Sequence, residues 1–249
     1  MPDGGCAGTW QRNRDVISTD ADTIGEDAMP VALTHSLLSD AQDSYGVLPA
    51  VTVDGDEIDF ERFTECVEWL AADLRSLGVD TGARVGLGVQ GGWALVLAWH
   101  ALVAVDAIVI PLDLCDVEAL RESGSLDVDF VLTHEALDDA LEDVITVLAD
   151  PIAATPVYRV ADEFALVEIN PLSNVRVGGG GLVADPRTGC VERTPRLLAE
   201  ADRVGGRLDL WPGARVHLQG ALNTRPALLL IIACAARGAC ACLEATSAS

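Results

Sequence analysis

A pattern that occurs twice constrains the fold of this chain more than any other feature. In the first copy, Gly-Ala-Arg-Val at residues 82–85 opens a short β-branched run, and a Gly-Gly turn, an apolar segment over 93–104 and a second apolar run over 107–110 follow. Two apolar runs flanking a helix-length segment predict a βαβ unit whose strands are buried on both faces. The helical segment shows no polar face, so we expect it to be buried too.

The second copy lies near the C-terminal end of the sequence. It begins with Gly-Ala-Arg-Val at 213–216 and continues through an Asn-Thr-Arg-Pro turn to an apolar helix over 227–236 and a strand over 239–243. Repeats this far apart indicate a duplicated α/β subdomain, because solenoid repeats have shorter periods. We therefore predict an α/β fold with two similar βαβ-containing subdomains and mostly parallel sheets. The predicted divisions are an acidic tail (1–30), a first α/β subdomain (31–169), a Gly-rich linker (170–181) and a partial second α/β subdomain (182–249).

Local signals predict most of the remaining elements. Asp54-Gly55 predicts a hairpin turn between strands over 50–53 and 57–58. Asp59 is placed to cap a helix whose apolar positions recur every three or four residues, and Gly78 is placed to end that helix. Further predictions are helices over 117–122, 136–148 and 195–203, strands over 128–133 and 157–160 that continue a parallel sheet, another strand over 164–169, and a tight hairpin over 182–192.

The charge of the chain limits its partners and its setting. There are 39 acidic and 16 basic residues, no Lys at all, and a net charge of −23. Nucleic acids and anionic membrane surfaces are polyanions, so neither is expected as a partner. The excess of Asp over Glu favours a halophilic protein from a high-salt cytoplasm, where salt screens the repulsion between carboxylates. The alternative is an acidic protein from a GC-rich genome, in which Arg replaces Lys.

The sequence also indicates a cytoplasmic location. The first thirty residues lack the apolar core of a signal peptide. The long apolar stretch over 93–112 contains His100, Asp106 and Pro111, which argue against a transmembrane helix.

Residue types that carry chemistry are scattered. The seven cysteines form no Cys-x-x-Cys pair, and Cys240 and Cys242 would share one face of a strand with no His within twenty residues. We interpret them as buried reduced thiols and predict no metal site. His100 lies on the apolar helix and is interpreted as a core histidine. The acidic residues at 138–139 and 142–143 indicate a solvated helix face. No residue is predicted to be catalytic.

Residues 45–243 nevertheless resemble the start of the adenylate-forming superfamily, which includes acyl-CoA synthetases, luciferases and peptide-synthetase adenylation domains. The resemblance rests on the hairpin and Asp-capped helix, Leu-Gly-Val-x-x-Gly-x-Arg-Val, the apolar helix before Val-Ile-Pro-Leu-Asp, and the second copy. It implies the fold of the N-terminal domain of those enzymes and an AMP-forming acid ligase ancestry.

One departure from that family concerns ATP. The resemblance implies a Ser/Thr-Gly-rich loop ending in Pro-Lys-Gly that embraces the phosphates. Its place here is taken by a shorter stretch without Lys: Asp185, Pro186, Arg187, Thr188 and Gly189. Asp-Pro-x-x-Gly predicts a type I turn, whereas a phosphate cradle needs successive free N–H groups and a cation. The glycines at 178–181 precede a strand and lack a Lys, so they are interpreted as a linker.

We therefore expect no cofactor and predict a truncated acyl-CoA synthetase-like N-terminal lobe. It would be inactive alone and act as a binding or interaction module. The alternative is a subunit of a split carboxylate-CoA/AMP ligase, completed by a separate chain with the adenine and ribose site and the catalytic Lys. Apolar residues over 228–232 and a strand edge within 227–243 predict self-association or a protein partner.

Overall fold

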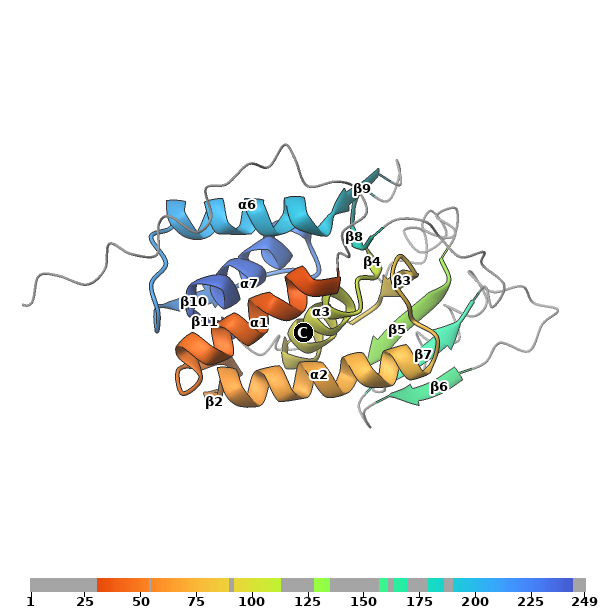
Figure 1. The fold of residues 1–249 in the computed structure, drawn as a ribbon, viewed down its shortest axis with the longest axis horizontal. Coiled ribbons are helices and arrows are strands. Elements are labelled where there is room, and N and C mark those ends of the chain that lie inside the picture. The colour runs from red at the N-terminus through yellow and green to blue at the C-terminus, as the bar shows by residue number, and fades with distance from the viewer. Residues whose placement is uncertain are drawn as a thin grey trace, which may run out of the picture.

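A computed structural model describes residues 31–53, 55–89, 92–112, 128–134, 157–160, 164–169, 179–185 and 190–243 of the chain. The predicted tail over 1–30 and the predicted helices over 117–122 and 136–148 lie outside these ranges. The elements, in chain order, are α1 (Val31–Tyr45), β1 (Pro49–Val53), β2 (Asp56–Asp59), α2 (Phe60–Ser76), β3 (Arg84–Leu87), α3 (Gly92–Ala104), β4 (Ile108–Pro111), β5 (Phe130–His134), β6 (Val157–Val160), β7 (Phe164–Glu168), β8 (Gly181–Asp185), β9 (Cys190–Arg193), α6 (Thr194–Arg207), β10 (Arg215–Leu218), α7 (Arg225–Arg237) and β11 (Cys240–Leu243) (Figure 1).

The strands form two sheets, which confirms the predicted α/β class. The larger sheet has the order β6-β7-β5-β3-β4-β8-β9, and the smaller has the order β10-β11-β1-β2. The strands β5, β3, β4 and β8 are parallel to one another, as are β10, β11 and β1. The prediction that 157–160 extends a parallel sheet is wrong, because β6 pairs antiparallel with β7 and β7 with β5. The three residues between β6 and β7 are too few for a parallel crossover.

The two βαβ units agree in backbone detail. In the first, the Gly82 amide donates to the Asp106 carbonyl at 2.8 Å, and in the second the Gly213 amide donates to the Gly238 carbonyl at 2.7 Å. Gly82 and Gly213 have φ values of 78° and 83°, and the residues that follow the two helices, Asp106 and Gly238, have φ values of 58° and 66°. The duplication therefore includes the hydrogen bonds and left-handed residues that close each unit.

The duplication extends to the helix before each unit. Gly78 follows α2 with φ 91°, and Asp209 follows α6 with φ 51°, each four residues before the glycine that opens the first strand. Each copy is thus an α-β-α-β unit: α2-β3-α3-β4 in the larger sheet and α6-β10-α7-β11 in the smaller.

The hairpin and the helix after it also form as predicted. β1 and β2 pair antiparallel, with Gly55 at φ 95° in the turn. The Asp59 carboxylate accepts a hydrogen bond from the Arg62 amide at 2.8 Å and so caps α2. The buried face of α2 contains the residues expected from the spacing, namely Phe60, Phe63, Val67, Leu70 and Leu74.

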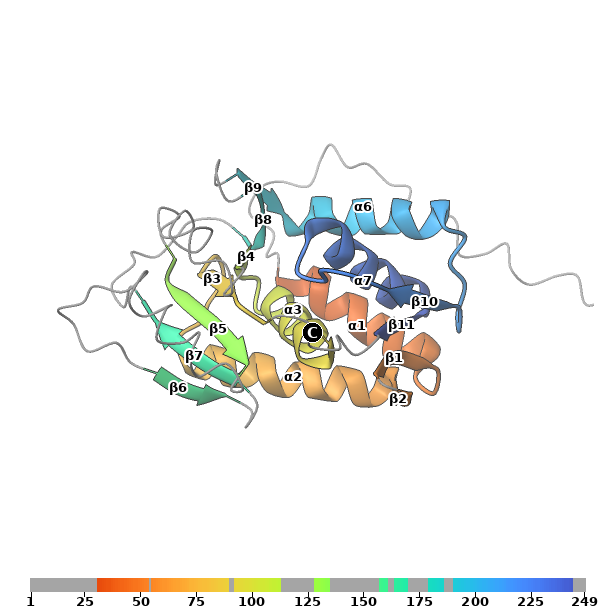
Figure 2. The same cartoon turned by 180° about the vertical axis from the view of Figure 1, so that it is seen from behind.

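Helices lie between the two sheets. α3 contacts β1 of the smaller sheet and β3 and β4 of the larger, and α2 contacts β1, β2 and β6. Figures 1 and 2 show the two sheets toward opposite ends of the molecule, with α3 between them. Leu95, Trp99 and Leu102 of α3 are fully buried, which confirms the expectation for an all-apolar helix. One continuous apolar core therefore runs through both halves.

The sheets take strands from both sides of the predicted domain boundaries. β8 and β9, from the predicted second subdomain, extend the larger sheet beside β4, whereas β1 and β2, from the first, complete the smaller sheet beside β11. Within the predicted linker, Gly180 is buried, and a Cβ atom there would lie 2.5 Å from the Asp106 carbonyl carbon. Gly181 is already the first residue of β8.

The C-terminal edge differs from expectation. Leu228, Leu229, Ile231 and Ile232 are at most 4% exposed, because α7 packs them into the core. β11 is not an edge strand, since it pairs with β1 on one side and β10 on the other. Leu230 is the one residue of 228–232 that is partly exposed, and it also packs against the core. The outer strands of the smaller sheet are β10 and β2.

No helix within the described ranges is long and apolar enough to span a bilayer.

Candidate functional site

The carboxyl edge of the larger sheet is the place where the topology favours a ligand site. The parallel strands β3, β4, β5 and β8 end there at Leu87, Pro111, His134 and Asp185. The chain leaves β3 for β4 on one side and returns to β5 on the other side, so the strand order reverses at β3. In open α/β sheets, ligands bind at the carboxyl ends of strands next to such a reversal.

Both α-β-α-β copies contribute to this edge. The Leu112 amide, just after β4, donates to the Leu87 carbonyl at 3.0 Å. The Leu112 carbonyl in turn accepts a hydrogen bond of 2.7 Å from Asn223 Nδ2, in the turn between β10 and α7. Asn223 therefore fixes the start of α7 against the end of β4. The helices α3 and α7 both begin at this side, so two helix N-termini with their partial positive charge lie near it.

A charge cluster connects α7 with the hairpin β8–β9 and with α6. Arg225, the first residue of α7, donates to Glu192 on β9 through Nε (2.7 Å) and Nη2 (2.9 Å), and to Glu200 on α6 through Nη2 (2.7 Å). Arg196 Nε lies 3.3 Å from Glu192 Oε1, the oxygen that also accepts from Arg225 Nη2. The Glu192 side chain is only 7% exposed, so this is a nearly buried, bidentate pair.

The cluster perturbs the ionisation of its members in the expected directions. Hydrogen bonds from Arg225 hold the pKa of Glu200 below its usual value, and the two carboxylates raise the pKa of the Arg225 guanidinium. Arg225 and Arg196 together match the two carboxylates in charge. An anionic ligand at this edge would therefore have to compete with Glu192 and Glu200 for Arg225.

The sequence did not point to this cluster, although one signal was present. Arg225 stands in the first turn of a helix, where the helix dipole disfavours a cation. A cation at that position needs carboxylate partners, and Glu192 and Glu200 supply them.

The predicted phosphate-loop position lies mostly outside the described residues. Asp185 ends β8 and pairs in register with Cys190, the first residue of β9. Pro186, Arg187, Thr188, Gly189 and the side chain of Asp185 are not described. The structure therefore places the two ends of this turn at the carboxyl edge of the sheet, and the interpretation of the turn itself stays a prediction.

The described histidines do not gather at one place. His134 ends β5 at the carboxyl edge, with its ring edge-on to Phe164 at 6.2 Å. His217 is exposed on β10, in the other sheet. His100 is 4% exposed and lies edge-on to Phe63 at 5.1 Å, as expected for a core histidine. Burial lowers the pKa of His100 to about 4, so the imidazole is neutral at pH 7.

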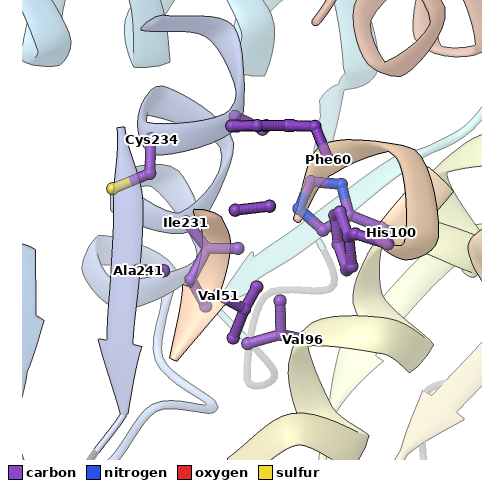
Figure 3. Close-up of a pocket in the computed structure, with 10 residues that line it drawn as sticks. Val51, Phe60, Val96, His100, Ile231, Cys234 and Ala241 are labelled. Atoms are coloured by element: carbon purple, nitrogen blue, oxygen red, sulfur yellow. The ribbon is translucent and has the colours of Figure 1, made fainter. Parts of the chain in front are cut away.

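A small cavity lies next to His100, between the smaller sheet and its helices (Figure 3). It is lined by side chains from β1, α2, α3, α7 and β11, among them Val51, Phe60, Val96, Ile231 and Ala241. Its free volume of about 10 Å³ is close to the least that one water molecule needs. This cavity is a gap in core packing and is too small for a substrate.

Within the described part of the chain, no three His, Cys, Asp or Glu side chains are arranged to hold a metal ion.

Comparison with known proteins gives a match in structure. No family model matches the sequence, and no curated protein matches it. The N-terminal domain of FACL13 from Mycobacterium tuberculosis superimposes with a TM-score of 0.61 at 14% identity, covering 85% of this chain and 56% of that one. O-succinylbenzoate coenzyme A synthetase from Bacillus subtilis gives 0.59 at 12% identity, covering 84% and 44%. The nonribosomal peptide synthetase FmoA3 gives 0.58 at 18% identity, covering 85% and 22%.

These matches confirm the resemblance at the level of fold. The chain has the architecture of the N-terminal domain of adenylate-forming enzymes, and it spans about half the length of the first two chains described above.

Proposed function

We propose that this chain is an N-terminal lobe of the adenylate-forming fold that does not activate a carboxylate by itself and acts as a binding or interaction module. The observation that carries the proposal is a fold match over 84–85% of the chain, combined with Asp-Pro-Arg-Thr-Gly where the family has its phosphate loop. A site for triphosphate needs cations and free amides. At the same edge, Arg225 is already engaged by two carboxylates.

Carboxylate-dependent ATP–pyrophosphate exchange tests this function. The purified chain, assayed with a panel of aliphatic, aromatic and amino acids, is expected to give no exchange above the enzyme-free background. Calorimetry is expected to detect no ATP·Mg²⁺ binding at millimolar nucleotide. A dissociation constant below about 100 μM, equivalent to more than roughly 5 kcal/mol, would overturn the proposal.

A second candidate function is a subunit of a split ligase, and the open edge of the smaller sheet favours it. β10 pairs with β11 on one side, and no described strand pairs with its other side. Just before β10, Leu208 and Trp211 are 53% and 63% exposed. Parallel sheets are usually covered on both faces and continued at their edges, so an exposed parallel edge beside two apolar side chains suits a further strand from a partner chain.

Reconstitution distinguishes the two functions. If the chain is a ligase subunit, adding the product of a neighbouring reading frame should produce ATP–pyrophosphate exchange that neither chain shows alone. Trp211→Ala should then weaken the association at least tenfold, as expected for an aromatic anchor at an interface. Trp69→Ala is the matched control, because Trp69 is equally exposed (64%) but lies on α2. Equal weakening by both variants would argue against the β10 edge.

A substitution at Ile231 cannot test whether residues 227–243 form a partner surface. Ile231 is 2% exposed, so Ile231→Asp would bury a charge and unfold the protein rather than release a partner. Light scattering of the wild type and of Trp211→Ala tests self-association without that complication.

A further inference from the structure

The smaller sheet has a face that points away from the helices. Residues paired in register share a face of a sheet, and the register pairs Arg215 with Cys240 and Cys242 with Thr52. Ala241, between the two cysteines, lines the cavity on the helix side. The side chains of Cys240, Cys242, Thr52 and Arg215 therefore lie on the opposite, outer face.

Two thiols lie close together on this face. Cys240 Sγ and Cys242 Sγ are 4.0 Å apart. The Thr52 hydroxyl lies 3.1 Å from Cys240 Sγ, at hydrogen-bond distance. Cys240 and Cys242 are 0% and 5% exposed although they face away from the core helices. Side chains on the outer face must therefore cover them.

An ion pair supplies part of this cover. Arg215 on β10 pairs with Glu57 on β2, and β10 and β2 are the two outer strands of the sheet. The side chains meet across β11 and β1, which carry Cys240 and Thr52. Both are 48% exposed, and exposed ion pairs are weak. This part of the cover can rotate away without any movement of the backbone.

We propose that Cys240 and Cys242 bind one soft monovalent d¹⁰ cation, of the Cu(I) type, in two-coordinate fashion. Thiolates are the ligands that such ions prefer. A metal–thiolate bond of about 2.3 Å places two sulfurs on opposite sides of an ion about 4.6 Å apart, which is within roughly 0.6 Å of the separation found here. Two-coordination needs no third ligand, although His217 of β10, which pairs with Cys242 in register, lies on the same face.

The charges around the pair suit the bound state. On binding, each thiol loses its proton to solvent and forms one sulfur–metal bond, so two protons leave for each cation. The bis-thiolate complex then carries one net negative charge, which Arg215 on the same face offsets only in part, because Arg215 also pairs with Glu57. Thr52 can donate its hydroxyl proton to the Cys240 sulfur.

Anaerobic titration with Cu(I) in competition with bicinchoninate tests the site, which is independent of the proposed function. The wild type is expected to bind one ion per chain tightly enough to remove Cu(I) from bicinchoninate. Cys240→Ser/Cys242→Ser should weaken that binding at least hundredfold. Cys234→Ser, which removes a buried thiol from α7, is the matched control and should leave it unchanged.

A single substitution outside the two cysteines keeps the proposal testable if the double variant does not fold. Arg215→Gln keeps both thiols and removes the offsetting charge, so it should weaken Cu(I) binding about tenfold. Wild-type affinity in the folded double variant, or no tight binding by the wild type, would overturn the proposal.

Discussion

At the scale of single residues, His100 makes the fold sensitive to acid. It stays neutral in the folded core with a pKa of about 4, but regains a value of about 6.5 on unfolding. The unfolded state therefore binds the extra proton between pH 6.5 and 4, and the free energy of unfolding falls by up to about 3 kcal/mol as the pH falls through this window. His100→Gln should remove that part of the pH dependence, measured by urea unfolding at pH 7.5 and pH 4. His217→Gln, at an exposed site, should keep the wild-type slope, and an unchanged slope in His100→Gln would contradict the assignment.

Asp106 should act in the opposite direction. It is 1% exposed, no well-formed hydrogen bond reaches either carboxylate oxygen among the described residues, and burial raises its pKa against the opposing effects of the nearby Gly180, Arg193 and Thr194. A carboxyl group with a raised pKa destabilises the folded state at neutral pH, and the loss disappears as the pH falls through that pKa. Asp106→Asn tolerates the left-handed backbone and removes the charge, so we expect it to stabilise the protein at pH 7 by about 1 kcal/mol. Thermal unfolding should show a higher midpoint at pH 7; a lower one would mean that the carboxylate is stabilised by groups beside it.

At the scale of elements, Arg225 connects α7 with β9 and α6 through its hydrogen bonds to Glu192 and Glu200. Arg225→Met would leave Glu192 charged and nearly buried without its bidentate partner, so we expect the free energy of unfolding to fall by about 3 kcal/mol. Arg62→Met is the matched control, because its partner Glu65 is 47% exposed and the pair should contribute less than about 1 kcal/mol. Adding Glu192→Gln to Arg225→Met should restore part of the loss in a double-mutant cycle. Additive effects would mean that the two side chains do not interact.

Sequence patterns predict single helices, strands and turns better than they predict which strands pair with one another. The Asp59 cap, the apolar spacing of α2 and the repeated Gly-Ala-Arg-Val openings each depend on neighbouring residues, and each forms as predicted. Sheet order depends on contacts between distant segments, which hydrophobic periodicity does not encode. The pairing of β1 with β11 was therefore not predictable, nor was the addition of β8 and β9 to the larger sheet.

The candidate site follows the same division. The fold class and the reversal at β3 locate a carboxyl edge, and the predicted phosphate-loop turn begins and ends there, at Asp185 and Cys190. The Arg225 cluster required three elements far apart in sequence to be placed together. The order of the elements in the sequence is enough to locate the carboxyl edge of the larger sheet. It does not predict which charged side chains meet there.

At the scale of the whole molecule, net charge should dominate the response to salt. With a charge of −23, carboxylate repulsion is weakly screened in dilute buffer, and the Debye length shortens to about 3 Å at 1 M salt. We expect the melting temperature to rise continuously from 0.1 to 3 M KCl. Sucrose at matched osmolality is the control, because it stabilises by exclusion and does not screen charge. A flat KCl profile would favour the ordinary acidic protein over the halophilic one.

The position of β1 beside β11 has a consequence for how the protein matures. Thr52 and Cys240 touch across a separation of 188 residues. At synthesis rates of about 5–20 residues per second, the β1–β2 hairpin waits roughly 10 to 40 s for its neighbour to be made. During this interval the edge of β1 that will pair with β11 has no partner for its backbone groups, and long loop closure slows the final pairing further. Newly made chains are thus open to capture by chaperones or to pairing with one another until the last strand emerges.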